Sequence, residues 1–238
     1  MPLTELRPTL RLVPTARIRF HENPERRRTE RLMARIKQDA LLRNPPIVAT
    51  MPGEDYLLLD GANRVSAFRE LGHDLVPVQL VDYGSQAIQL KGWHHLLVDG
   101  RALNLKSQYG MLRGVALQKV PREQLGPLLE FRRIYAALVD ESYQAWGLFP
   151  QPPGRAIPIH QRIETLNQII SCYEGQSKLE RIKLVDYSKL PEVLRTVEHQ
   201  LCLFPVLTKE ELLQLTQDGV MLPTGITRHL IPGRALGL

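Results

Sequence analysis

The clearest change of hydrophobic pattern in the chain lies between Tyr56 and Gly72. Tyr56 to Leu59 is a short apolar run that follows Pro52-Gly53, which indicates a buried strand. From Ala62 to Leu71 the apolar residues recur with the spacing of one helix face, and Gly72 is of the type that ends helices. The pattern therefore predicts a strand that turns into a helix within two residues.

The rest of the first eighty residues alternates between strand and helix patterns. We expect an opening strand within Leu10–Phe20 and further strands at Ile47–Ala49 and Val76–Val81. A helix is expected to start near Thr29, and its inner face would hold Leu32, Met33, Ile36 and Ala40. This order predicts an α+β (mixed α/β) module.

The middle of the chain gives weaker signals. A short strand is expected at Ala87–Leu90, and the glycines within Arg101–Val120 suggest loops. A β-hairpin is expected from Ile134–Val139 and Tyr143–Phe149, followed by an amphipathic helix at Gln161–Tyr173. No two neighbouring helical patterns joined by a short glycine turn occur, which counts against a helix-turn-helix domain.

The last helix has a distinct start. Thr208 and Glu211 form a capping-box pattern, which predicts a helix that runs through Gln217 and ends at Gly219. The tail beyond it holds Thr224, Gly225, Thr227, Arg228 and His229. Glycine permits a tight turn, and the hydroxyl and cationic donors suit a phosphate or a carboxylate. The alternative is an ordinary frayed and basic C-terminus.

Composition limits the class of protein. The 238 residues, of which 43% are hydrophobic, suffice for one large or two small soluble domains. No apolar run could span a bilayer, and Met1–Glu5 lacks the start of a signal peptide. Cys172 and Cys202 form no CxxC motif, so we expect free thiols in a reducing cytoplasm and no structural metal site.

The net charge is +6, and much of the excess is arginine near the N-terminus. Such arginines could contact nucleic acid, cover the solvated face of a helix, or gather near a phosphate-binding cleft. Charge alone does not decide among these three interpretations.

The predicted turn between Leu59 and Ala62 carries the candidate chemistry. A helix that starts there leaves its first amide groups available to an anion. Asp60 and Asn63 could bind a metal or a hydroxyl, and the fork of Arg64 fits phosphate oxygens. The plain alternative is that Asp60 caps a solvated first turn.

These residues resemble a known superfamily. Asp60-Gly61-Ala62-Asn63-Arg64, followed by Leu71-Gly72 and Val76-Pro77-Val78, is similar to the ParB/sulfiredoxin signature. Sulfiredoxins have a catalytic cysteine where Ala62 stands here, and partition proteins add a helix-turn-helix domain. The free L-serine kinases resemble the chain most. They comprise an archaeal ADP-dependent enzyme and an ATP-using relative from staphyloferrin siderophore biosynthesis.

This resemblance implies a fold and a domain division. It implies a ParB/sulfiredoxin-like nucleotide-binding domain in residues 1–98. Residues 99–238 would form a C-terminal α+β domain whose tail returns to the active site.

The resemblance also assigns roles to single residues. Glu22 would be the base for the serine hydroxyl, with Glu25 and Glu30 as the next candidates, and Asp60 would be catalytic and hold Mg²⁺, directly or through water. Trp93 would wall the serine pocket. Phosphates would contact Gly61, Ala62, Asn63, Arg64, Thr227, Arg228 and His229, and the substrate would contact Thr224 and Gly225. Without the resemblance, Glu22 is an ordinary loop acid and Trp93 a core residue.

The implied activity is a cytoplasmic kinase that phosphorylates free L-serine to O-phospho-L-serine with Mg²⁺ and ADP or ATP. Asn63 stands where the archaeal enzyme has histidine, and asparagine cannot titrate near neutrality, so the choice of donor stays open. The alternative is a ParB-like nucleotide-dependent regulator that binds DNA. No membrane partner is expected.

Overall fold

The computed structural model describes residues 9–154, 157–183, 190, 194 and 198–236. The chain forms two compact units. Unit 1 comprises Met1–Leu90, Thr208–Thr224 and His229–Leu238, and unit 2 comprises Lys91–Leu207 and Gly225–Arg228. This division differs from the expected domain boundary between residues 98 and 99. The last helix and most of the tail belong to the same unit as the N-terminal residues.

Unit 1 is built on a five-stranded mixed sheet. Its strand order is β1 (Thr9–Pro14), β5 (Leu75–Val81), β3 (Ile47–Thr50), β4 (Tyr56–Asp60) and β2 (Ile18–Arg19). β2 pairs with β4 and β3 pairs with β5 in parallel, while the other neighbours are antiparallel. The mixed sheet with helices confirms the predicted α+β class.

The expected opening strand is divided in two. The 3-10 helix η1 (Thr15–Arg17) separates β1 from β2, which lie at opposite edges of the sheet. Pro14 has no amide hydrogen to continue a ladder. The buried Thr15 is then held by the loop after α2, since its amide donates to Asp74 O at 2.8 Å and its hydroxyl to His73 O at 3.1 Å.

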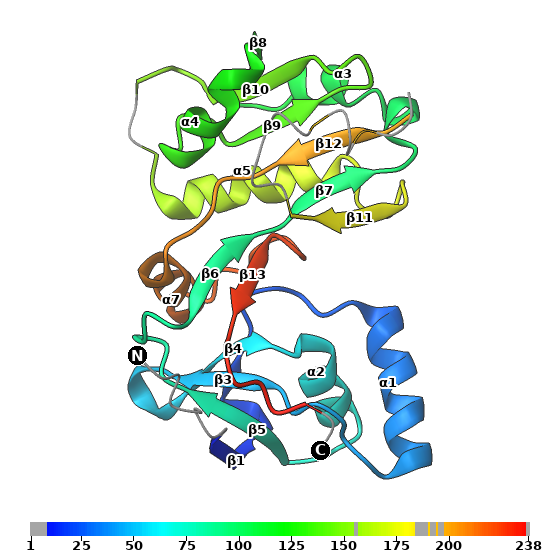
Figure 1. Ribbon diagram of the computed structural model, residues 1–238, viewed down its shortest axis with the longest axis vertical. Helices are drawn as coiled ribbons and strands as arrows, with labels where there is room; N and C mark the ends of the chain where they lie inside the picture. Colours follow the sequence, from blue (N-terminus) through cyan, green and yellow to red (C-terminus); the bar gives the residue numbers. More distant parts are fainter. Residues whose placement is uncertain (1–8, 155–156, 184–189, 191–193, 195–197, 237–238) are drawn as a thin grey trace. The chain divides into compact units, whose positions relative to one another are not determined.

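The described residues of unit 1 also form the helices α1 (Arg26–Asp39), α2 (Ala62–Glu70) and α7 (Lys209–Gln217). α2 begins where the sequence predicts, directly after β4 (Figure 1). α1 begins three residues earlier than expected, and Leu32, Met33 and Ile36 are only half-buried. A short 3-10 turn, η2 (Pro52–Glu54), connects β3 to β4. The buried core between sheet and helices contains Val13, Ile18, Val48, Leu58, Val65, Val76 and Val78.

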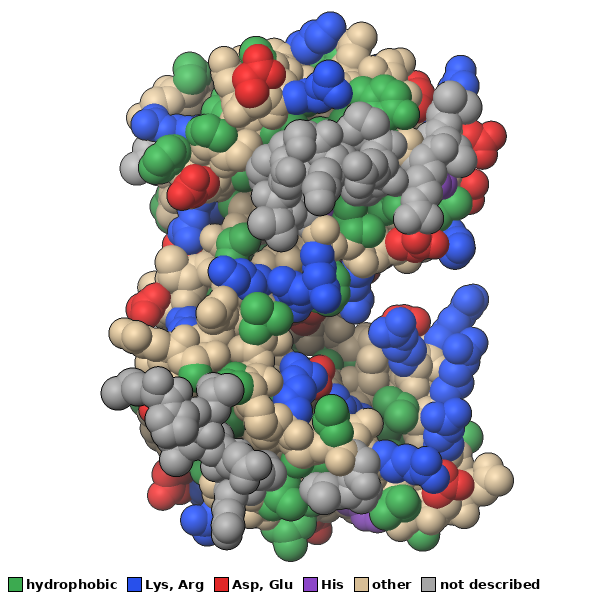
Figure 2. Space-filling view, in the orientation of Figure 1, with side chains coloured by type: hydrophobic (Ala, Val, Ile, Leu, Met, Phe, Trp, Pro, Cys, Tyr) green, Lys and Arg blue, Asp and Glu red, His purple; other side chains and the backbone are tan. Residues whose placement is uncertain are grey.

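The N-terminal arginines lie largely on the exposed face of α1. Figure 2 shows lysine and arginine side chains along this helix at the right of the view. Arg26 pairs with Glu30 and Arg28 with Glu25, each at 3.1 Å. These arginines therefore form a solvated helix face, and whether they contact nucleic acid stays a prediction.

Unit 2 is built on a six-stranded antiparallel sheet. Its order is β11 (Leu179–Ile182), β7 (His94–Leu97), β12 (Gln200–Leu203), β9 (Ala136–Val139), β10 (Ala145–Pro150) and β8 (Val115–Val120). β9 and β10 confirm the predicted hairpin. α5 (Ile159–Ser171) confirms the amphipathic helix and buries Ile163, Leu166, Ile169 and Ile170.

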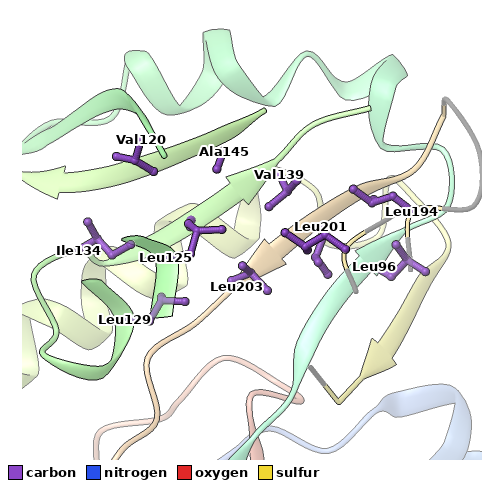
Figure 3. Close-up of a cluster of buried hydrophobic side chains, with 12 residues drawn as sticks. Leu96, Val120, Leu125, Leu129, Ile134, Val139, Ala145, Leu194, Leu201 and Leu203 are labelled. Atoms are coloured by element: carbon purple, nitrogen blue, oxygen red, sulfur yellow. The ribbon is translucent and has the colours of Figure 1, made fainter. Parts of the chain in front are cut away.

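The core of unit 2 packs strands against short helices. Figure 3 shows Leu96, Val139, Leu201 and Leu203 from the sheet in one cluster with Leu125 and Leu129. The last two belong to α4 (Leu125–Glu130), which follows the 3-10 turn η4 (Arg122–Gln124). Burial of such side chains stabilises a fold by roughly 1.5–3 kcal/mol each.

The expectation of loops at Arg101–Val120 is wrong. This segment holds η3 (Gly100–Leu103), α3 (Leu105–Gly110) and the edge strand β8. Its glycines mark the junctions between short elements, as at Gly114, whose φ is +76°. Leu105 and Tyr109, one turn apart on α3, are fully buried and hold the helix in place.

Two strands lie where the chain passes from one unit into the other. β6 (Gln89–Gly92) and β13 (Thr227–Leu230) form a separate two-stranded sheet. β6 begins two residues later than expected. In the described part of the chain, α3, α4 and α5 are separated by strands, so none of them forms a helix-turn-helix pair. No helix among the described residues is long and apolar enough to cross a membrane.

The start of α7 gives a test of the fold. Thr208 Oγ1 accepts from the Glu211 amide at 3.2 Å, and the Glu211 carboxylate accepts from the Thr208 amide at 2.8 Å. Thr208→Ala removes half of this capping box and is expected to cost about 1 kcal/mol in the free energy of unfolding. Urea denaturation measures this, with Thr208→Ser as the control that keeps the hydroxyl. An alanine variant as stable as the parent would contradict the cap.

Candidate functional site

The turn between β4 and α2 requires glycine. Gly61 has a φ of +103°, in the left-handed region. A Cβ at this position would also lie 3.0 Å from Pro46 Cβ and 3.1 Å from Arg64 Nε. Gly61 occupies the N-cap position of α2 and offers no side chain to its first amides. An anion is the natural partner for amides at such a helix start.

Asp60 lies between two arginines. Its Oδ2 atom accepts from Arg64 Nη2 at 2.9 Å and from Arg234 Nη1 at 3.1 Å. The side chains of Asp60 and Arg234 are 37% and 33% exposed, so a ligand can reach both. One carboxylate and two guanidinium groups leave a net positive charge, which favours an anionic ligand.

Arg64 also supports the turn itself. Its side chain is 17% exposed, and its Nη1 donates to the carbonyls of Asn44 and, at 3.3 Å, Pro45. The predicted phosphate-binding arginine thus fixes the loop before β3 at the same time. Substituting it would disturb both the loop and any ligand contact.

Asn63 links α2 to the start of α1. Its Oδ1 accepts from the Glu25 amide at 2.6 Å and from the Thr29 hydroxyl at 3.3 Å. The acceptor end of the predicted phosphate-binding side chain is therefore engaged within the protein. The neighbouring Ala62 contributes only its backbone.

Glu22 lies beside the segment that follows α7. A parallel bridge joins Glu22 to Leu222, whose amide donates to His21 O at 2.8 Å. Thr224 Oγ1 donates to Asn23 O at 3.4 Å. The structure thus brings the loop of the predicted base together with the predicted substrate-binding residue Thr224.

His229 differs from the expected cationic donor. It is buried, and its Nε2 is 2.9 Å from Tyr83 Oη. Burial lowers the pKa of His229 to about 3, and the nearby His21 adds to the effect. The imidazole is therefore neutral at physiological pH in the structure without a ligand.

The sequence did not single out Arg234 and Gln79. Gln79 on β5 is buried, and its Nε2 donates to Gly233 O while its Oε1 accepts from the Ala235 amide, both at 2.9 Å. One glutamine thus holds the residues on either side of Arg234 and directs the tail to Asp60. A glutamine within an apolar strand is the feature of the sequence that could have indicated such a role. Its partners could not be predicted, because they lie more than 150 residues further along the chain.

Four of the predicted site residues belong to unit 2. Arg228 lies over the ring of Trp93, with its Cζ 5.0 Å from the ring centroid, and the Trp93 amide donates to Ile226 O at 3.0 Å. Gly225 has a φ of +79°, and its carbonyl is 3.0 Å from His95 Nε2. Thr227 precedes Arg228 on β13.

The adjacent histidines of β7 have separate partners. The Phe204 amide donates to His94 Nδ1 at 3.2 Å, whereas His95 Nδ1 lies 2.8 Å from Tyr173 Oη. The two side chains therefore make different contacts, as adjacent residues on a strand do. Within the described residues, no group of three or more His, Cys, Asp and Glu residues could hold a metal ion.

No protein-family model matches the chain. An ATP-dependent L-serine kinase of Staphylothermus marinus is 24% identical over 245 residues, which cover 98% of this chain and 88% of that protein. The ATP-dependent L-serine kinase SbnI of Staphylococcus aureus is 26% identical over 235 residues, covering 96% and 81% of the two chains.

A solved structure shows the same fold. A free serine kinase variant in complex with AMP superposes with a TM-score of 0.79 at 19% identity, and the match covers all of this chain and 94% of the other. Sequence and fold together confirm the resemblance that the Asp60–Arg64 motif indicated: the chain is similar over nearly its whole length to the free L-serine kinases.

Proposed function

We propose that the chain is a kinase that phosphorylates the hydroxyl of free L-serine with an adenine nucleotide as donor. The relatives named L-serine kinases support this proposal. The single observation that carries it in this chain is the turn at Gly61, where a helix N-terminus meets a carboxylate held by two arginines. Phosphoryl transfer needs such positioning and charge neutralisation more than covalent chemistry.

The phosphates are proposed to lie against the start of α2. The backbone of Gly61, Ala62 and Asn63 would supply amides, and Arg64 and Arg234 would supply charge. His229, being neutral and bonded to Tyr83, has a positioning role in this proposal rather than a charged one.

Asp60 fits a magnesium ion that arrives together with the nucleotide. Mg²⁺ commonly takes one or two carboxylates along with substrate phosphates. Because both arginines contact Asp60 Oδ2, a bare cation meets two positive groups there, whereas a nucleotide would offset them. The ion would neutralise charge on the transferred phosphoryl group.

Glu22 is proposed as the base. The serine oxygen bonds to the terminal phosphorus, the bond from that phosphorus to the nucleotide's bridging oxygen breaks, and Glu22 accepts the hydroxyl proton. Glu25 and Glu30, which pair with Arg28 and Arg26 of α1 at 3.1 Å, are the next candidates. Trp93, Thr224 and Gly225 are proposed to contact serine, and Thr227 and Arg228 to contact phosphate.

We propose ATP as the donor, since both relatives are named for it, with ADP as the alternative. The free cysteines Cys172 and Cys202 agree with a reducing compartment, for which we propose the cytoplasm. The relatives favour this kinase over a ParB-like DNA-binding regulator.

The direct test incubates the purified chain with L-serine, Mg²⁺ and either ATP or ADP, and detects O-phospho-L-serine by mass spectrometry. L-Alanine, which lacks the hydroxyl, is the matched control. Phosphoserine with one or both donors is the expected result. Its absence with both would refute the proposed activity.

Glu22→Gln tests the base. The amide keeps the shape of the side chain but cannot accept the proton, so kcat should fall by about 10²–10⁴-fold while the KM for nucleotide stays nearly unchanged. Steady-state kinetics measures both, and Glu25→Gln is the control within the same loop. If the Glu22→Gln variant turns over serine as fast as the parent, Glu22 is not the base.

Arg234→Ala tests the second arginine. Loss of a charge-assisted hydrogen bond should weaken binding of Mg²⁺–ATP by about 1.5–3 kcal/mol, or roughly tenfold or more. Calorimetric titration measures this, and thermal unfolding checks that the variant stays folded. Arg17→Ala is the control, because it removes an exposed arginine of unit 1 that pairs with Glu54 at 2.7 Å. Equal weakening by both variants would mean that only general charge matters.

A further inference from the structure

Two buried histidines of unit 1 lie next to each other. His21 directly precedes Glu22, and His229 lies on β13. The two side chains are only 7% and 6% exposed, and their ring centroids are 5.7 Å apart. A buried imidazole costs free energy unless its polar atoms find partners, so the partners of these rings indicate what they hold.

Both rings bond to the end of β4. The His21 ring donates to the backbone carbonyl of Leu58, and the His229 ring donates to that of Leu59. These two residues immediately precede Asp60. The two histidines therefore hold the last residues of the strand that carries Asp60.

The end of β4 has backbone groups to offer because the strand extends past its neighbours. β2 ends opposite Leu57, whereas β4 continues to Asp60. On the other side, Leu58 and Asp60 have partners in the register with β3, and Leu59 between them is an extra residue. Such a bulge leaves its extra residue outside the ladder and is common next to active sites.

His21 also fixes the position of its neighbour Glu22. The His21 carbonyl accepts from the Leu222 amide at 2.8 Å, and Glu22 forms a parallel bridge with the same residue. Burial lowers the pKa of the His21 ring, and the nearby Glu22 carboxylate opposes this effect. His21 thus connects the strand that carries Asp60 to the segment beside Glu22.

We infer that His21 is a positioning residue, which sets the place of the Glu22 carboxylate relative to Asp60. This inference rests on the proposed function, in which Glu22 accepts the serine proton and Asp60 holds the metal ion of the nucleotide. A general base must lie within about 2.6–3.2 Å of the atom whose proton it takes, so a small displacement of the carboxylate slows the reaction.

The test compares the parent chain with His21→Leu and His21→Gln. Leucine is apolar and cannot bond to the Leu58 carbonyl, whereas the glutamine amide keeps a donor. Thr15→Val is the control, because it removes another buried hydrogen bond of unit 1, from the Thr15 hydroxyl to His73 O at 3.1 Å. Steady-state kinetics measures kcat and the KM for nucleotide, and thermal unfolding checks that each variant is folded.

We expect kcat of His21→Leu to fall by roughly tenfold to a hundredfold, because a displacement of about 1 Å can cost this much. The KM for nucleotide should stay within about twofold of the parent, since the base contacts serine rather than phosphate. His21→Gln should recover much of the loss, and Thr15→Val should keep the parental kcat. Parental kcat in His21→Leu, a loss that glutamine does not reduce, or an equal fall in Thr15→Val would overturn the inference.

Two further measurements require no turnover. Hydrogen exchange of the Leu222 amide, which donates to His21 O, should be about tenfold faster or more in His21→Leu than in the parent and in Thr15→Val. NMR of the imidazole nitrogens in the parent should show a His21 ring that stays neutral below the usual pKa of histidine. This second measurement needs no variant, so it also serves if His21→Leu fails to fold. Unchanged exchange, or a ring that titrates as an exposed histidine does, would overturn the inference.

The outcomes separate this inference from the proposed function. A chain that fails to phosphorylate serine, but in which His21→Leu frees the Leu222 amide, would refute the proposed function alone. A chain that phosphorylates serine at the same rate with histidine or leucine at position 21 would refute the positioning role alone.

Discussion

The charge pairing of Asp60 with Arg64 and Arg234 is the interaction on which the candidate site depends. Arg64 lies four residues from Asp60, but Arg234 comes from 174 residues further along the chain. Both guanidinium groups bond the same carboxylate oxygen, which fixes their positions before any ligand arrives. The site therefore needs little reorganisation to receive an anion, and preorganisation of this kind lowers the cost of binding.

Other features of unit 1 serve this pairing. The absence of a side chain at Gly61 lets the turn lie against Pro46 and places Asp60 directly before the helix. Gln79 holds both neighbours of Arg234 from within the sheet. The same pairing bears on metal binding by Asp60. The two arginines give the site a net positive charge, which disfavours binding of a free cation and favours a metal ion that arrives bound to a nucleotide.

Local signals in the sequence predicted much of unit 1 and the hairpin of unit 2. The apolar run before Asp60, the helix spacing after it and the capping box at Thr208 each depend on a few neighbouring residues, so they are readable without the fold. Residues 101–120 were misread because their elements are short and are held by burial of Leu105 and Tyr109 rather than by propensity.

The features of the site that escaped prediction arise from long-range packing. Nothing near Arg234 in the sequence indicates that it reaches Asp60. Sequence alone predicts that His229 is a cationic donor. Its burial cannot be read from its neighbours in the sequence, because His21 and Tyr83, which lie beside it, come from distant segments of the chain. Charge state in a folded protein follows burial, which residue type alone does not reveal.

The central claim, that the turn at Gly61 binds nucleotide phosphates, can be tested residue by residue. Proton–nitrogen NMR spectra of the labelled chain, titrated with Mg²⁺–ATP, report on each backbone amide. The account predicts that the amides of Gly61, Ala62 and Asn63 shift together with the side-chain signals of Arg64 and Arg234, in a saturable manner. Saturable binding that leaves these amides unmoved would contradict it.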